Sequence, residues 1–182
     1  MSEPEVRINL SRARLLLVDA SPQGLGILNQ LVAGLGARLI TKCTGAAAAA
    51  AHLTADPYDL LIIDADLPGP VSGYDLVRRL RRNATSPNQQ SAVILLCGHT
   101  PAKSVARARD CGVSLLIAKP VSPKVVLDRI RWLARDRRDF VDCGDIYVGP
   151  DRRFHEQPEP PGGRTGRRRE DAAPDPNKEA SA

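Results

Sequence analysis

Residues 60–69 read Leu-Leu-Ile-Ile-Asp-Ala-Asp-Leu-Pro-Gly, so four consecutive apolar residues end at Asp64 and a Pro-Gly turn follows. An apolar run this short, with no alternation, is typical of a parallel strand that is buried on both faces. A carboxylate at the end of such a strand lies at the carboxyl edge of an α/β sheet, where open sheets build their sites. Because Asp is also common in ordinary turns, Asp64 alone does not establish a site.

A second run of the same kind favours the functional interpretation. Residues 15–18 are apolar and end at Asp19, and Ser21-Pro22 then has the pattern of a helix N-cap followed by a first helical proline. Two buried strands that each end in aspartate predict two carboxylates at the same edge of the sheet.

The rest of the first 138 residues alternates between strand and helix patterns. We expect strands at 14–18, 38–42, 60–64, 92–97 and 115–118, and helices at 22–35, 45–53 (capped by Thr44), 73–82, 102–110 and from 123. Five such units predict an α/β fold with a doubly wound parallel sheet, most often in the flavodoxin-like order 2-1-3-4-5. In that order the first and third strands are neighbours, which brings Asp19 and Asp64 together.

Length and composition narrow the class of protein. A chain of 182 residues suits one domain with a modest extension. The start of the chain has no apolar stretch long enough for a signal peptide or membrane span, so we expect a cytoplasmic protein. The four cysteines lack metal-ligand spacing, and we expect small buried residues. Residues 135–182 carry 10 Lys and Arg against 11 Asp and Glu, which argues against nucleic-acid binding.

The ends of the strands suggest a phosphoryl site. Two adjacent carboxylates repel each other unless a cation joins them, and their oxygen atoms suit Mg²⁺. Lys119 follows the fifth strand and can place a positive charge against a phosphoryl oxygen.

Four short motifs resemble those of the response-regulator receiver (CheY-like) family, over residues 12–138: Val18-Asp19, Asp64 with Pro68-Gly69, Cys97-Gly98 and Lys119-Pro120. The resemblance implies that Asp64 accepts a phosphoryl group from a histidine kinase or a phosphotransfer protein. It further implies that Asp19 binds magnesium and that Lys119 contacts the phosphate, with a cis bond before Pro120. On this resemblance the protein is a signalling module of a two-component phosphorelay and not an enzyme.

The sequence departs from the family pattern at the positions that carry chemistry. The family has a second acid after the first strand, where this chain has Ala20, and Asp66 could restore a carboxylate. The family has a hydroxyl residue that contacts the phosphate at the end of the fourth strand. This chain has Cys97 there, and its thiol is a weak hydrogen-bond donor. In the fifth strand, this chain has Leu116 where the family has an aromatic switch residue. We therefore expect weak magnesium binding and slow phosphorylation of Asp64.

The segment 139–156 is predicted to be a recognition segment, and 157–182 to be disordered because it lacks apolar periodicity. Residues 147–153 read Tyr-Val-Gly-Pro-Asp-Arg-Arg and resemble the arginine-rich C-terminal segment of CheY-like cyclic di-GMP effectors. Arginine can bind guanine edges and phosphates, aspartate the guanine Watson-Crick edge, and tyrosine can stack on the base. The residues assigned to this ligand are Arg137, Arg138, Tyr147, Asp151, Arg152 and Arg153.

Two functions remain open from the sequence. The first is a single-domain response regulator that acts by docking to a downstream protein partner, without DNA or membrane binding, and with cyclic di-GMP as a possible ligand. The alternative is an adaptor that docks to proteins independently of phosphorylation and whose tail is a peptide motif.

Overall fold

Five parallel strands form the centre of the computed structural model, which describes residues 9–98 and 102–152. The strands are β1 (Arg14–Val18), β2 (Leu39–Cys43), β3 (Leu60–Asp64), β4 (Ala92–Cys97) and β5 (Leu115–Ala118). Their order is β2-β1-β3-β4-β5, and every pairing in this sheet is parallel. The predicted fold class and strand order are confirmed.

Five helices connect the strands: α1 (Pro22–Gly34), α2 (Ala46–Ala55), α3 (Gly73–Arg82), α4 (Ala102–Cys111) and α5 (Pro123–Leu133). Serine side chains cap the first turns of α1, α3 and α5, where each accepts a backbone N–H. The predicted Thr44 cap of α2 is wrong, since the N-cap residue is Gly45 and makes no side-chain cap bond. The six consecutive alanines in α2 favour a helix without that bond.

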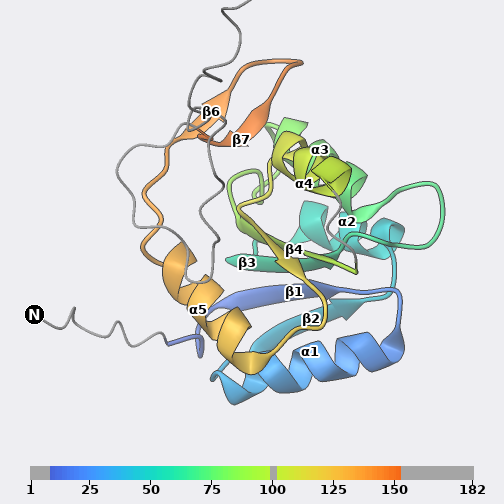
Figure 1. The fold of residues 1–182 in the computed structure, drawn as a ribbon, viewed down its shortest axis with the longest axis vertical. Helices are drawn as coiled ribbons and strands as arrows, with labels where there is room; N and C mark the ends of the chain where they lie inside the picture. Colours follow the sequence, from blue (N-terminus) through green and yellow to red (C-terminus); the bar gives the residue numbers. More distant parts are fainter. Residues whose placement is uncertain (1–8, 99–101, 153–182) are drawn as a thin grey trace, which may run out of the picture.

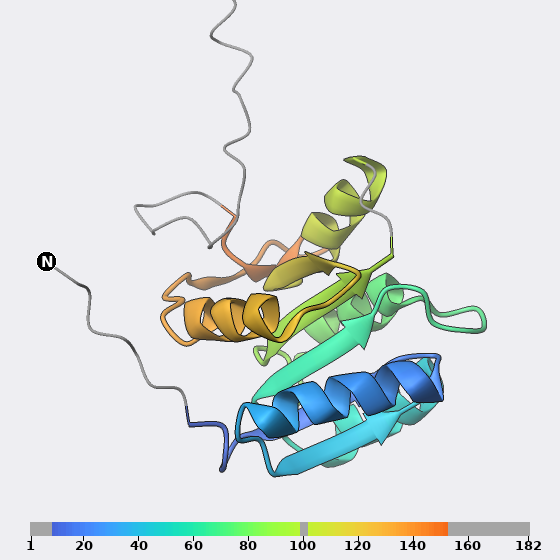
Figure 2. The same ribbon diagram turned by 60° about the horizontal axis from the view of Figure 1, so that its bottom comes forward.

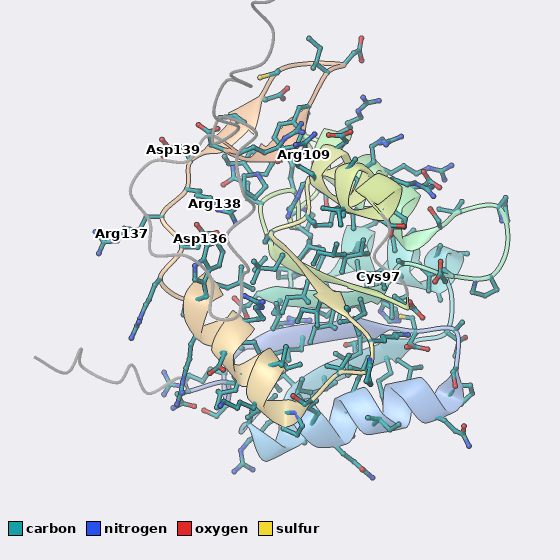
Figure 3. The ribbon with its side chains drawn as sticks, in the orientation of Figure 1. Cys97, Arg109, Asp136, Arg137, Arg138 and Asp139 are labelled. Atoms are coloured by element: carbon teal, nitrogen blue, oxygen red, sulfur yellow. The ribbon has the colours of Figure 1, made fainter. Side chains whose placement is uncertain are left out.

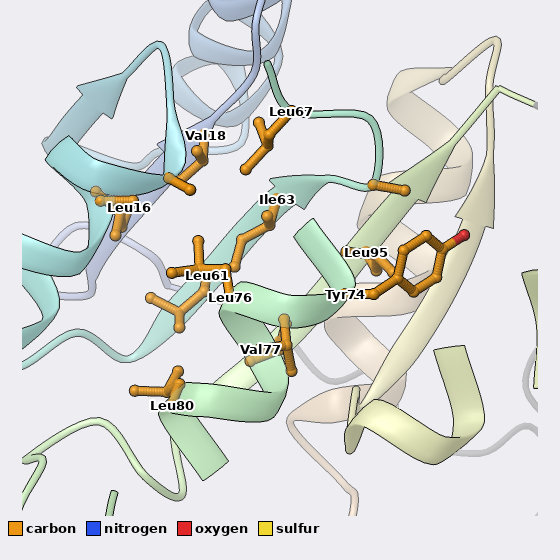
Figure 4. Packing of buried hydrophobic residues seen from close by; sticks show 14 of the residues in the cluster. Leu16, Val18, Leu61, Ile63, Leu67, Tyr74, Leu76, Val77, Leu80 and Leu95 are labelled. Atoms are coloured by element: carbon orange, nitrogen blue, oxygen red, sulfur yellow. The ribbon is translucent and has the colours of Figure 1, made fainter. Parts of the chain in front are cut away.

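The helices cover both faces of the sheet (Figures 1 and 2). Alternate residues of each strand point to opposite faces, so the strands supply two cores. Leu15 and Leu17 of β1 belong to the core under α1 and α5, while Leu16 and Val18 belong to the core under α2, α3 and α4. In the second core, residues of α3 such as Leu76 and Val77 pack on the middle strands (Figure 4). Buried residues on both faces explain the unbroken apolar runs of the sequence.

The segment after α5 forms a β-hairpin, whereas the sequence indicated no regular structure there. Strands β6 (Phe140–Asp142) and β7 (Val148–Pro150) pair in an antiparallel manner, and Cys143 N–H donates to the carbonyl of Tyr147 at 2.7 Å. Figure 1 shows the hairpin beside α3 and α4. The sequence analysis did not predict these two strands, and the recognition role assigned to residues 139–156 stays a prediction. The segment 157–182, predicted to be disordered, lies outside the described residues.

The hairpin lies directly on the chain at the end of α4. A Cβ atom on Gly112 would lie 2.4 Å from the carbonyl oxygen of Val148, so only glycine permits this approach. The φ of Gly112 is +87°, a left-handed conformation that also favours glycine. Gly112 thus both ends α4 and receives the hairpin.

The cysteine prediction is correct for three residues and wrong for one. Cys43, Cys97 and Cys111 are buried, Cys143 in the hairpin turn is exposed, and all four thiols are free. Within the described residues, none of the helices has the length and apolar character needed to cross a membrane.

Candidate functional site

Asp64 lies at the carboxyl end of β3, where the backbone fixes it on two sides. Its strand pairs with both β1 and β4, and the next residue, Ala65, donates its N–H to the carbonyl of Leu96 at 2.7 Å. On the other side α3 begins against it, because a Cβ on Gly73 would lie 2.1 Å from the Asp64 carbonyl oxygen. Asp64 is only 6% exposed, so its carboxylate is held in a narrow position.

Asp19 occupies the matching position on β1, and the two strands pair Val18 with Ile63 just before the two aspartates. Its Oδ1 accepts the N–H of Ser21 at 2.8 Å. A Cβ on Gly24 would lie 2.7 Å from this same oxygen, so α1 closes around the carboxylate. The predicted pairing of Asp19 and Asp64 at the carboxyl edge of the sheet is confirmed.

Lys119 joins the two carboxylates. Its Nζ lies 2.7 Å from Asp64 Oδ2 and 3.1 Å from Asp19 Oδ2. The backbone brings it there, because Lys119 N–H donates to the carbonyl of Cys97 and the peptide bond to Pro120 is cis, as the resemblance implied. Burial lowers the pKa of Lys119, but hydrogen bonds and charge interactions with Asp64 and Asp19 outweigh it and leave the pKa above its ordinary value.

Cys97 lies at the end of β4 on the same edge, with a buried side chain. Within 9–98 and 102–152, its thiol makes only a long contact, 3.7 Å, to the carbonyl of Ile117. Burial first, and then the negative charges of Asp66 and Asp64, raise the pKa of the Cys97 thiol. The group is therefore an uncharged, weak donor beside the acidic pair.

Asp66 is exposed, and its backbone N–H donates to Asp64 Oδ1 at 3.3 Å. Ala20 offers no side-chain oxygen, and the oxygens of Asp19 are already bonded to Ser21 and Lys119. In the chain as described, 9–98 and 102–152, no group of three or more His, Cys, Asp and Glu residues is placed to hold a metal. The side chains present do not fit a dedicated magnesium site.

Leu116, at the position of the expected aromatic residue, is partly buried and packs against the core under α2, α3 and α4. An aromatic residue that the sequence analysis missed, Tyr74 of α3, lies under Arg107 of α4, with the guanidinium carbon 4.5 Å from the ring centroid. Arg107 also bonds to Ser72 and Asp75 at the start of α3. These contacts join the start of α3 to α4 close to Asp64.

The sequence analysis also missed Gly24 and Gly73. Both glycines lie in the first turn of a predicted helix, where glycine costs stability without a compensating contact. That position is the signal that could have identified them as sites of close approach.

Those residues assigned to cyclic di-GMP that the structure describes do not form one open cluster. Arg138 lies on the connection from α5 to β6, bonds to Asp136 at 2.6 Å and donates to the Ser114 carbonyl. Figure 3 shows Arg137 and Arg138 on this connection, apart from Cys97. The backbone N–H of Asp151 donates to Asp139, which lengthens the hairpin.

The remaining residues of that set are used within the hairpin. Tyr147 is 6% exposed, and its hydroxyl donates to the carbonyl of Pro150 at 2.7 Å. The guanidinium carbon of Arg152 lies 3.5 Å from the Tyr147 ring centroid, and its Nη1 lies 2.7 Å from Asp110 Oδ1. Arg153 lies outside the described residues. The stacking face and one arginine proposed for a guanine are thus occupied by contacts within the chain.

Comparison with known proteins agrees with this geometry. A model of the response regulator receiver domain matches residues 15–131. The virulence sensor protein BvgS of Bordetella pertussis is 30% identical over 132 residues, which cover 71% of this chain and 10% of BvgS. The transcriptional activator protein ExaE of Pseudomonas putida is 32% identical over 118 residues, covering 64% of this chain and 53% of ExaE. The chain therefore spans about a tenth of BvgS and about half of ExaE.

Solved structures show the same fold. A mutant receiver domain of the histidine kinase CKI1 from Arabidopsis thaliana has a TM-score of 0.63 at 19% identity, covering 70% of this chain and 93% of that domain. The chemotaxis response regulator CheY4 of Vibrio cholerae has a TM-score of 0.59 at 19% identity, covering 65% of this chain and 96% of CheY4.

Proposed function

This chain belongs to the response regulator receiver family, and from this premise we propose that Asp64 is the phosphoryl acceptor of a two-component phosphorelay. The single observation that carries the proposal is the position of Lys119 Nζ, 2.7 Å from Asp64 and 3.1 Å from Asp19. A buried carboxylate beside a fixed ammonium can take on a phosphoryl group, because the ammonium balances the negative charge that the group brings.

The proposed donor is the phosphohistidine of a histidine kinase or a phosphotransfer protein. One oxygen of Asp64 attacks phosphorus, the P–N bond to the donor breaks, and its electron pair remains on the donor imidazole. Oδ2 is bonded to Lys119, whereas among the described residues Oδ1 accepts only a 3.3 Å hydrogen bond from the backbone of Asp66. Oδ1 is therefore the attacking oxygen, and Lys119 stays against the new phosphoryl group.

We further propose that this acceptor is slow. Receiver domains typically bind Mg²⁺ for phosphorylation, and here Ala20 supplies no ligand. Cys97 replaces a hydroxyl with a weaker donor, so its hydrogen bond stabilises a phosphoryl oxygen only slightly. The output is docking to a downstream protein partner, and the competing function is an adaptor that docks without phosphorylation.

Cyclic di-GMP binding by the tail stays a separate prediction. Arg152 would first have to leave both Asp110 and the ring of Tyr147, and each broken contact lowers the net affinity. This cost favours the phosphoryl acceptor as the principal function.

Incubation of the full chain with acetyl phosphate, followed by intact mass measurement, tests the proposal. We expect slow addition of one phosphoryl group, lost in Asp64→Asn. Ala20→Asp should raise the rate in the presence of Mg²⁺ by at least about tenfold, as expected for a restored metal ligand, and Ala20→Asn is its uncharged control. Rapid modification of the unaltered chain would contradict the slow acceptor, and no modification under any condition would favour the adaptor.

A further inference from the structure

A cavity lies at the end of the sheet opposite to Asp64, between α3, the end of α4 and the hairpin. Its volume is about 290 Å³, and its walls come from Arg78, Arg81 and Arg82 of α3, Asp110 and Cys111 of α4, and residues 145–148. In Figure 1 the hairpin lies against these two helices. The position of Gly112 on Val148 shows that the hairpin closes one side of this space.

Arg81 is a buried cation in this cavity, and none of the described residues gives it an anionic partner. The residue is 1% exposed, its Nε donates to the Gly112 carbonyl at 2.9 Å, and its Nη1 donates to the Gln89 carbonyl. Its third nitrogen, Nη2, is enclosed and has no hydrogen-bond partner among the residues that the structure describes. Burial of a charge without a counter-ion is costly, so a site of this kind favours an anion.

The neighbouring arginines add to this positive charge. Arg78 is half-buried and makes no hydrogen bond or ion pair within 9–98 and 102–152. Arg82 donates from Nη2 to the backbone carbonyl of Asp145 at 2.6 Å, a bond that does not neutralise its charge. Asp110, the acid on the α4 side, is already paired with Arg152 at 2.7 Å.

The uneven distribution of charge among the helices supports the same conclusion. Helix α3 carries four arginines and one aspartate, Asp75. That aspartate lies in the first turn, where it is paired with Arg107, so it is used at the other end of the helix. By contrast, α1 and α2 contain no Asp, Glu, Lys or Arg at all.

We propose that this cavity, hereafter the arginine cavity, binds a phosphate group. Guanidinium groups offer paired N–H donors that match phosphate oxygens, and a dianion can balance Arg78 and Arg81 together. The volume exceeds that of a phosphate ion, so the group can belong to inorganic phosphate or to a small phosphate ester. The site is separate from Asp64 and does not depend on phosphoryl transfer there.

The test is calorimetric titration of the full chain with sodium phosphate, with sodium chloride at equal ionic strength as the control for screening. We expect saturable binding of phosphate and none of chloride. Arg78→Ala should weaken the phosphate Kd by at least about tenfold, because a charge-assisted hydrogen bond is lost. The matched control is Arg79→Ala, since Arg79 is an exposed neighbour on α3 that does not line this cavity, and its Kd should equal that of the unaltered chain.

Further titrations distinguish a phosphate ester from inorganic phosphate, and the arginine cavity from the site at Asp64. Binding of adenosine monophosphate at least tenfold more tightly than phosphate would assign the site to a phosphate ester, and equal affinity would assign it to inorganic phosphate. Adenosine should not bind. Equal Kd values for Arg78→Ala and the unaltered chain, or loss of binding in Lys119→Ala in place of Arg78→Ala, would overturn the proposal.

Discussion

The two ends of α3 solve the problem of buried charge in opposite ways. At its start, Gly73 lies against Asp64, where two carboxylates share the ammonium of Lys119. At its end, Arg81 is buried with carbonyl groups and a ring as partners, and its guanidinium carbon lies 5.6 Å from the centroid of Phe140. The first site has its counter-charge within the chain, whereas no described residue supplies one to Arg81.

The two sites therefore differ in what an incoming ion has to displace. A cation that approaches Asp19 and Asp64 must compete with Lys119, which adds to the effect of Ala20 in the weak metal binding that we propose. An anion that approaches Arg78 and Arg81 displaces no acidic partner among residues 9–98 and 102–152.

The largest effect is expected for Gly73→Ala, at the start of α3. The new Cβ would lie 2.1 Å from the Asp64 carbonyl oxygen, which is backbone and cannot rotate away. We expect the free energy of unfolding, measured in urea, to fall by about 3 kcal/mol. The matched control is Gly26→Ala in α1, whose Cβ meets nothing within 4 Å. Because alanine is the better helix former, the control should be neutral or more stable, and equal losses in both variants would refute the close approach.

An intermediate effect is expected for Lys119→Met, which leaves two buried carboxylates without their shared cation. We expect a loss of about 2 kcal/mol at neutral pH, as is usual when a partner of a buried charge is removed.

The pH dependence checks the cause of that loss. The folded pKa of Lys119 is raised, so its contribution is complete below the unfolded pKa of about 10.4 and is lost as the pH rises through the folded pKa. The difference between the two proteins, followed by thermal unfolding, should be constant from neutral pH to about pH 10 and shrink above it. A difference that persists unchanged in strong alkali would show that packing of the lysine stem, and not its charge, is responsible.

The smallest effect is expected for Arg152→Ala, after β7 and beside the arginine cavity. The lost contacts are a partly exposed ion pair with Asp110 and the stacking on Tyr147, which together should cost about 1 kcal/mol. A double-mutant cycle with Asp110→Ala isolates the ion pair. Strict additivity of the two single changes would mean that the pair does not hold the hairpin in place.

Much of the sheet could be predicted because its strands are buried on both faces. The bounds of β3, β4 and β5 follow directly from apolar runs that end at Asp64, Cys97 and Ala118. The same logic located Asp19, Asp64 and Lys119, since parallel strands bring their carboxyl ends to one edge. The positions of Gly24 and Gly73 in the first turns of helices could have indicated a close approach, but not which carboxylate each one packs against, because that depends on distances between elements.

The hairpin escaped prediction for a related reason. Each of its strands has three residues, too few to show an alternating pattern, and a lone hairpin is marginally stable. It folds on partners far away in sequence, above all Arg82, Asp110 and Gly112. Arg138, Tyr147 and Arg152, which the sequence assigned to a ligand, therefore serve tertiary contacts that no local pattern reveals.

The single exposed thiol makes this hairpin chemically addressable. Burial raises the pKa of Cys43, Cys97 and Cys111, whereas Cys143 lies exposed in the turn between β6 and β7. Thiolates react and protonated, buried thiols do not. A maleimide dye added to the unaltered chain should therefore attach at Cys143 alone and report from beside the arginine cavity, without any engineered cysteine.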